Sequence, residues 1–166
     1  VTERKPYALW CGETVPESGT PSQCYFIDHN GYLFNQAPMF SEGVYLEVYA
    51  GLDYVTEHDP LRARIKEKDF KATEDIYENF KQKIAEPSKI IIKSDDEILV
   101  VLNRPVEYQL LHGVEVRMSQ SLSPATTTAF LLKALPVQFP VGTTTTKRLQ
   151  YIDVRFGNKI FFGFDE

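Results

Sequence analysis

Several features that commonly reveal the function of a protein are missing from this sequence. No apolar run approaches the roughly 20 residues that a membrane-spanning helix requires. No charged stretch followed by a short apolar block marks a signal peptide. The net charge is −5, so the chain lacks the broad basic field that is typical of proteins that bind nucleic acid. The composition therefore argues against nucleic acid as a partner.

Local signs of catalysis are missing as well. There is no Gly-x-Ser-x-Gly elbow, and no Cys–His signature surrounds Cys11 or Cys24. The nine glycines are scattered, so no glycine-rich turn forms a phosphate loop. The acidic run 95–97 falls where the pattern demands a hairpin turn. We therefore predict a protein that is not an enzyme and that has no cofactor and no small-molecule substrate.

The two cysteines, Cys11 and Cys24, flank a Gly-, Pro- and Ser-rich segment that is typical of a loop between strands. They form either a disulfide in an oxidising compartment or two buried thiols on neighbouring strands. We favour the disulfide. A zinc site would need two further ligands, and His29, His58 and His112 show no ligand spacing, so we predict no metal.

The sequence does contain enough apolar residues for a folded core. The chain has 166 residues, of which 43% are hydrophobic and 13% aromatic, as expected for one main domain. Strand patterns occur near residues 5–11, 24–28 and 32–34. A further strand pattern over residues 43–52 predicts one packed face and one solvated face. The packed face would hold Val44, Leu46, Val48, Ala50 and Leu52, and the solvated face Tyr45, Glu47 and Tyr49.

Two helices are predicted. Residues 69–85 carry apolar side chains at helical spacing with charged residues between them, and Pro87 is expected to end the run. A second, shorter helix should begin with Ser123 as its cap and Pro124 at its first position. Pro136 is expected to stop it.

A hairpin is expected between these helices. A three-residue loop over residues 111–113 would place apolar residues on one face and charged residues on the other. This register pairs Val106 with Met118 and puts Gly113 at a left-handed position. With hairpins prominent, we predict an α+β fold built on a mainly antiparallel sheet with two helices.

A last hairpin is expected at the end of the chain, around Gly157 and Asn158. A two-residue loop has good turn chemistry, whereas a three-residue loop over residues 156–158 sorts the faces better. The sequence does not decide between these registers. In both, Phe161 and Phe162 point to opposite faces of the last strand.

A strand that is apolar on both faces is usually central in a sheet, yet no later strand follows this one to pair with it. If it lies at an edge, its free backbone groups can receive a strand from a partner. Alternatively, an earlier strand or an upstream part of the protein covers it. The pattern alone does not decide between these arrangements.

Two blocks of sequence resemble a known family. The first is "ERKPYALW" followed by "CYFIDHNGYLF" and "AP-x-F-S", and the second is the closing "LQYIDVRFGNKIFF". Both are similar to motifs of the bacterial cell-division family FtsQ/DivIB. Members have a membrane helix, a small domain and then a β domain outside the cytoplasm. The resemblance implies that residues 1–10 are an entry strand from a missing upstream domain and that residues 11–166 form one β-rich domain.

The resemblance implies a non-catalytic assembly protein of the divisome, acting in septum formation. Its partners would be division proteins like FtsB and FtsL, received by strand addition. It would lie at the extracytoplasmic face of the bacterial cell membrane, attached by a single N-terminal helix that is absent here, because the chain begins at Val1 in strand-like sequence. The second possibility is a binding module of another extracytoplasmic system, and the third is an unrecognised hydrolase. The partner-binding residues would be Tyr151, Asp153, Arg155, Lys159, Ile160, Phe161, Phe162 and Phe164.

Overall fold

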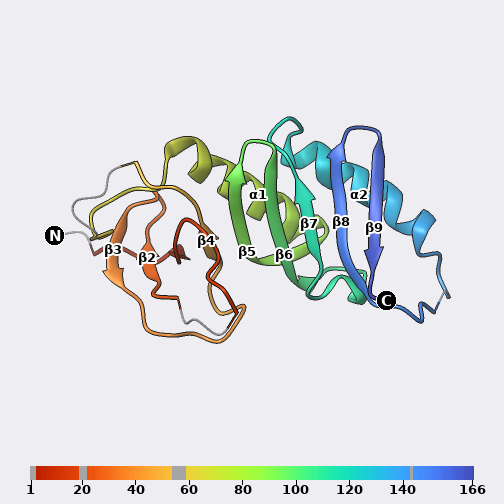
Figure 1. Ribbon diagram of the computed structural model, residues 1–166, viewed down its shortest axis with the longest axis horizontal. Helices are drawn as coiled ribbons and strands as arrows, with labels where there is room; N and C mark the ends of the chain where they lie inside the picture. The colour runs from red at the N-terminus through yellow and green to blue at the C-terminus, as the bar shows by residue number, and fades with distance from the viewer. Residues whose placement is uncertain (1–2, 19–21, 54–58, 143) are drawn as a thin grey trace.

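The computed structural model describes residues 3–18, 22–53, 59–142 and 144–166. Within them, nine strands form a single sheet, accompanied by two α-helices and one short 3₁₀-helix (Figure 1). The elements in chain order are β1 (Ala8–Trp10), β2 (Tyr25–Ile27), β3 (Leu33–Gln36), β4 (Glu47–Tyr49), α1 (Glu67–Lys83), β5 (Ala85–Ser94), β6 (Glu97–Pro105), η1 (Gln109–Leu111), β7 (Glu115–Met118), α2 (Pro124–Gln138), β8 (Leu149–Phe156) and β9 (Lys159–Phe164).

The sheet is mixed, so the expected α+β fold with a mainly antiparallel sheet of hairpins is wrong. The strand order is β3-β2-β1-β4-β5-β6-β7-β8-β9. Strands β1 and β4, β4 and β5, and β7 and β8 pair in parallel, and the other neighbours are antiparallel. Two of the parallel pairs are linked through a helix, β4–α1–β5 and β7–α2–β8.

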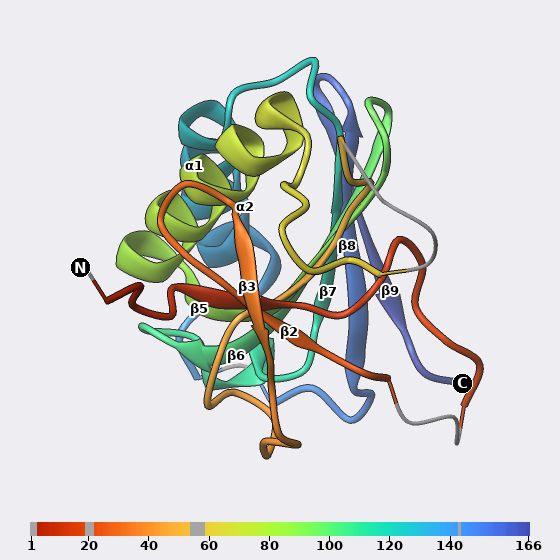
Figure 2. The same ribbon diagram turned by 90° about the vertical axis from the view of Figure 1, so that its left-hand side faces the viewer.

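These two crossover units explain where the helices lie. A crossover between parallel neighbours is almost always right-handed. Strands β4, β5, β7 and β8 all run in the same direction, and both crossovers advance the same way along the sheet. The same handedness therefore places both helices on one face of the sheet, as Figure 2 shows.

The main core lies between the sheet and the helices. In α1, the buried residues Phe70, Thr73, Ile76 and Phe80 recur at helical spacing and face the sheet, which confirms the predicted stripe. The helix ends at Lys83, before the expected end, and Pro87 lies inside β5 next to an irregularity in the register. The chain thus changes from helix to strand within two residues.

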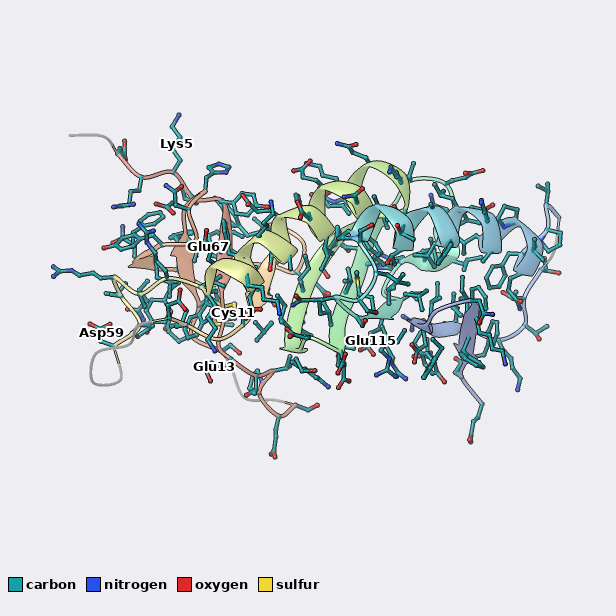
Figure 3. All side chains as sticks on the ribbon, turned by 90° about the horizontal axis from the view of Figure 1, so that it is seen from above. Lys5, Cys11, Glu13, Asp59, Glu67 and Glu115 are labelled. Carbon is teal, nitrogen blue, oxygen red and sulfur yellow. A yellow bond between two sulfur atoms is a disulfide. The ribbon has the colours of Figure 1, made fainter. Side chains whose placement is uncertain are left out.

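The opposite face carries a second, smaller core at the end of the sheet that contains β1–β4. It consists of Leu9, Cys11, Ala37, Tyr49, Ile91 and Leu99. Tyr49 is therefore buried and Val44 is exposed, which corrects the expected division into one packed and one solvated face. Farther along, Glu115 of β7 lies on this side of the sheet, away from the helices (Figure 3).

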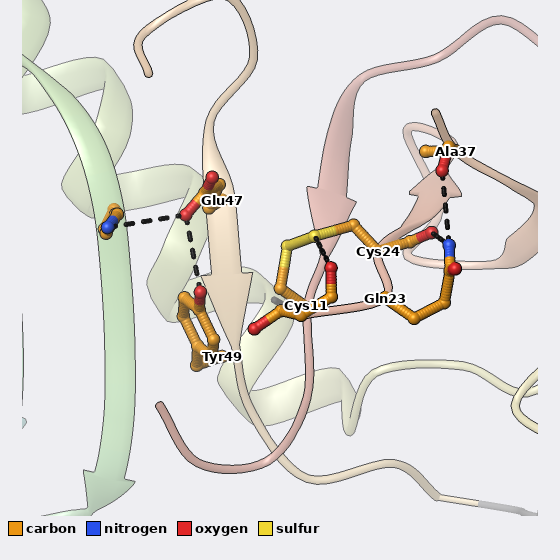
Figure 4. The surroundings of a disulfide bond; sticks show 8 residues. Cys11, Gln23, Cys24, Ala37, Glu47 and Tyr49 are labelled. Atoms are coloured by element: carbon orange, nitrogen blue, oxygen red, sulfur yellow. Dashed lines mark hydrogen bonds and ion pairs between the residues drawn. A yellow bond between two sulfur atoms is a disulfide. The ribbon is translucent and has the colours of Figure 1, made fainter. Parts of the chain in front are cut away.

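A disulfide joins Cys11, just after β1, to Cys24, just before β2 (Figure 4). Their Cα atoms are 4.2 Å apart and the residues are 13 apart in sequence. The bond closes the loop between two antiparallel neighbours. Strand β1 lies inside the sheet, between β2 and β4. The expected domain boundary between residues 1–10 and 11–166 stays a prediction.

The second helix extends past its expected stop. Ser123 caps α2, because its Oγ accepts a hydrogen bond from the backbone N of Thr126 at 3.1 Å, as predicted. Pro136, however, lies inside the helix. A proline in the last turn removes few intrahelical bonds, and Phe139 N still donates to Leu135 O at 2.8 Å.

The predicted three-residue loop over residues 111–113 is wrong. Strand β7 pairs with the earlier segment β6, with Ile98 opposite Met118, and residues 106–114 form a connection that contains η1. Val106 is exposed there. The apolar face of β6 matches β7 better than residues 106–110 do, since Ile98, Val100 and Leu102 are all buried. Gly113 does adopt the predicted left-handed conformation, with φ of 78°.

Candidate functional site

The C-terminal strand β9 forms one end of the sheet. Among the described residues it pairs with β8 alone. The other end, β3, is partly covered by a later segment, because Leu33 N donates to Ala63 O at 3.0 Å and Arg62 N donates to Leu33 O at 2.9 Å. Unpaired strand edges offer N–H and C=O groups to another chain. In the described part of the chain, β9 is therefore the longer edge without such cover, and it can accept a partner strand.

The hairpin between β8 and β9 combines both predicted registers. At its tip, Phe156 is opposite Lys159, so the turn has the two residues Gly157 and Asn158. The register then shifts, and Asp153 lies opposite Phe161, as a three-residue loop would require. A second shift lies between Leu149 and Tyr151. Each shift locally disturbs the ladder and bends the strand.

Alternate side chains of β9 face the helices. Ile160, Phe162 and Phe164 pack against the main core. Phe139, at the end of α2, meets Phe162 edge-to-face with ring centroids 5.6 Å apart. A groove of about 480 Å³ remains between α2 and β9. It is lined by Phe130, Lys133, Ala134, Val137, Gln138, Gly157, Asn158, Ile160 and Phe162.

The other side chains of β9 lie on the face without helices. Phe161 is 49% exposed and meets Phe156 edge-to-face at 5.5 Å between centroids. Lys159 is also exposed. Two phenyl rings and an ammonium group thus surround the free edge on this side, which gives a partner strand apolar contacts on both faces.

Asp153 and Arg155 form an ion pair on β8. Arg155 donates from Nη2 to Asp153 Oδ2 at 2.7 Å and from Nε to Oδ1 at 3.0 Å. Burial raises the pKa of Asp153, but hydrogen bonds from the Arg155 side chain and backbone, with the charges of Arg155 and Arg117, outweigh it and leave the pKa below its ordinary value. Asp153 is only 5% exposed. The carboxylate of the pair is thus shielded from solvent, and the pair holds the Arg155 side chain along β8.

Tyr151 lies flat over the edge strand. Its partner in the register is Gly163, and a Cβ built on Gly163 would lie 2.1 Å from Tyr151 Cε1. The Arg117 guanidinium sits 3.8 Å from the centroid of the same ring and also binds Glu115, with Nε 3.0 Å from Oε1. The ring therefore occupies the space that a side chain at Gly163 would need.

The structure brings all eight predicted partner-binding residues into the β8–β9 hairpin, but divides them between two faces. Tyr151, Asp153, Arg155, Lys159 and Phe161 share the face without helices, and Ile160, Phe162 and Phe164 pack toward α2. Sequence reasoning missed the Arg117–Tyr151–Gly163 stack and the contribution of α2. The available signal was Gly163, since a glycine inside an aromatic strand often marks the close approach of another group.

Within the described ranges, no group of three or more His, Cys, Asp or Glu side chains is arranged to hold a metal ion. No helix in this part of the chain is both long and apolar enough to cross a membrane. The chain matches no protein-family model and none of the curated proteins with which it was compared. The candidate site is therefore defined by the geometry of the β8–β9 hairpin.

Proposed function

We propose that this protein is a non-catalytic assembly protein that recruits a partner by adding the partner's strand to β9. The observation that carries the proposal is that β9 is hydrogen-bonded to β8 alone within the described residues. Backbone pairing would supply affinity, and the side chains on the two faces would select the partner. The aromatic rings of Phe161 and Phe162 make the largest contributions.

The remaining parts of the proposal rest on the sequence resemblance to FtsQ/DivIB. The partner is then an extracytoplasmic segment of a division protein like FtsB or FtsL. The protein acts in the divisome at the outer face of the bacterial cell membrane, anchored by a single upstream helix. The disulfide between Cys11 and Cys24 is compatible with an oxidising compartment of this kind.

Calorimetric titration against the extracytoplasmic segment of an FtsB-like protein tests the proposal. Phe161→Ser should weaken binding tenfold or more, because burial of a Phe side chain is worth roughly 1.5 to 3 kcal/mol. Ile160→Pro should weaken it further by removing a backbone donor from the edge strand. Val106→Ser is the matched control, since Val106 is also exposed but lies in the connection between β6 and β7.

Circular dichroism and thermal melting of each variant separate lost binding from lost folding. Folded Phe161→Ser, Phe162→Ser and Ile160→Pro proteins that all bind as well as the wild type would place the interface elsewhere. If the wild type fails to bind the FtsB-like segment, but captures another extended peptide in a manner that depends on Phe161, the family assignment fails and strand addition stands.

A further inference from the structure

A second hollow lies at the end of the sheet remote from β9, on the face without helices. It has a volume of about 640 Å³ and lies above the disulfide. One wall is formed by residues 15–18, which include Val15 and Glu17, and the other by the segment after β3, with Met39 and Phe40. Side chains of β4 and β5, Glu47, Tyr49 and Lys89, form part of its floor.

Covalent and hydrogen bonds join the two sides of the hollow at its base. The Cys11–Cys24 disulfide links the end of β1 to the start of β2, and Ala37 N donates to Cys24 O at 2.9 Å. The Gln23 side chain donates from Nε2 to Cys24 O at 2.9 Å and to Ala37 O at 3.2 Å, which ties one wall to the other (Figure 4). The base of the hollow is therefore formed before a ligand binds, which reduces the entropy lost on binding.

The walls expose apolar side chains to solvent. Met39 is 83% exposed, Val15 46% and Phe40 37%. The Phe40 ring is held at the base of its wall, because its centroid lies 4.9 Å from that of Tyr45 and 6.0 Å from that of Phe26. Apolar side chains gathered around a concave surface are typical of a binding site.

The charged side chains that line the hollow have a net negative charge, because Glu17 and Glu47 are accompanied by a single basic residue. No Lys or Arg occurs between Pro6 and Leu61, whereas this stretch contains acidic residues throughout. Glu17 is exposed on the rim. Lys89 is the one basic residue among those that line the hollow, and its Nζ lies 3.8 Å from Glu47 Oε2, so it offsets that carboxylate alone. A cationic group is the complementary partner.

We propose that this hollow binds a basic, apolar peptide segment of a partner protein. Aliphatic or aromatic side chains of the segment lie between Val15 and Met39, and a Lys or Arg side chain of the segment meets the Glu17 carboxylate. The site is remote from β9 and independent of strand addition. It would allow the protein to hold two partners at once.

The test is selection from a phage-displayed random peptide library on the folded, oxidised protein, followed by fluorescence anisotropy with the selected peptides. We expect the selected sequences to combine Lys or Arg with Leu, Phe or Trp, and their affinity to fall as the salt concentration rises. Met39→Ser and Glu17→Lys should each weaken binding about tenfold. Val141→Ser is the matched control, because Val141 is also exposed but follows α2 and does not line the hollow.

Three results would overturn the proposal. The first is no enrichment, or enrichment of peptides without cations. The second is affinity that Met39→Ser and Glu17→Lys leave unchanged in proteins with wild-type melting temperatures. The third is concentration-dependent self-association in sedimentation experiments that the same substitutions abolish, since the hollow would then receive a second copy of this chain.

Discussion

Gly163 provides the sharpest test of the geometry at the edge strand. In Gly163→Ala, the new Cβ would lie 2.1 Å from Tyr151 Cε1, 2.3 Å from Cζ and 2.6 Å from Cδ1, so the ring must move. Moving it gives up the stacking with Arg117, worth about 0.5 to 1 kcal/mol. A side chain displaced from its rotamer adds roughly 0.5 to 1.5 kcal/mol.

A gain offsets part of this cost. Alanine loses less backbone entropy than glycine when a strand forms, which favours Gly163→Ala by about 0.5 to 1 kcal/mol. We therefore expect Gly163→Ala to lower the free energy of unfolding by about 1 kcal/mol. In the Tyr151→Ala background the ring is gone, and the same change should stabilise the protein by roughly 0.5 to 1 kcal/mol.

Urea denaturation of the four proteins in this double-mutant cycle measures the coupling, which should be about 2 kcal/mol. The sign change between backgrounds is the decisive result. If Gly163→Ala has the same effect with and without the Tyr151 ring, the ring is not the reason for a glycine at this position.

Two further predictions concern stability. The pKa of Asp153 is lowered in the folded protein, so its pairing with Arg155 stabilises fully above the unfolded pKa, near 4, and that stabilisation is lost as the pH falls through the folded pKa. Asp153→Asn should lower the free energy of unfolding at pH 7 by about 1 to 3 kcal/mol. It should also flatten the decline of that free energy below about pH 4, as measured by urea denaturation at a series of pH values. An unchanged dependence on acid pH would contradict this. Replacing Cys11 and Cys24 by Ser should lower the free energy of unfolding by about 3 kcal/mol, because the bond joins residues 13 apart in sequence. Intact-mass analysis after alkylation tests the bond itself. Two alkylated thiols in the oxidised, folded wild type would contradict it.

Local patterns predicted the helices well. The apolar stripe of α1 and the Ser123 cap of α2 are encoded within a few residues, so the sequence reveals them directly. The ends are less well encoded. Helix α1 stops at Lys83 because the chain joins β5 at Ala85, and this depends on pairing with β6, which is distant in sequence at that point of the ladder.

The mixed sheet was not predicted, although its elements were present in the right order. A helix between two strands allows those strands to become parallel neighbours, and both helices here do this. The hairpin-like patterns in the sequence favoured antiparallel pairs instead. The β6–β7 register failed for a related reason, because residues 106–110 and β6 both offered apolar faces and only the completed core distinguishes them.

The hairpin at the candidate site shows a different limit of sequence reasoning. Turn chemistry favoured two residues, at Gly157 and Asn158, and face matching favoured the register of a three-residue loop. The structure satisfies both by inserting an irregularity between Asp153 and Phe156. Neither criterion was mistaken, but a bulge lets them act on different parts of the same hairpin.

An open, aromatic edge strand creates a risk of aggregation that the β8–β9 hairpin limits. Natural sheets protect such edges with charge, irregular pairing and short length. Here β9 has six residues, Lys159 is exposed at its start, and the register shifts twice along it. Because Gly163 has no side chain, a flat hydrophobic partner strand would have one contact fewer on β9. An arbitrary strand therefore cannot form a regular hydrogen-bond ladder with β9, whereas a segment shaped to those irregularities can pair with it. The features that limit aggregation thus also make the edge selective for its partner.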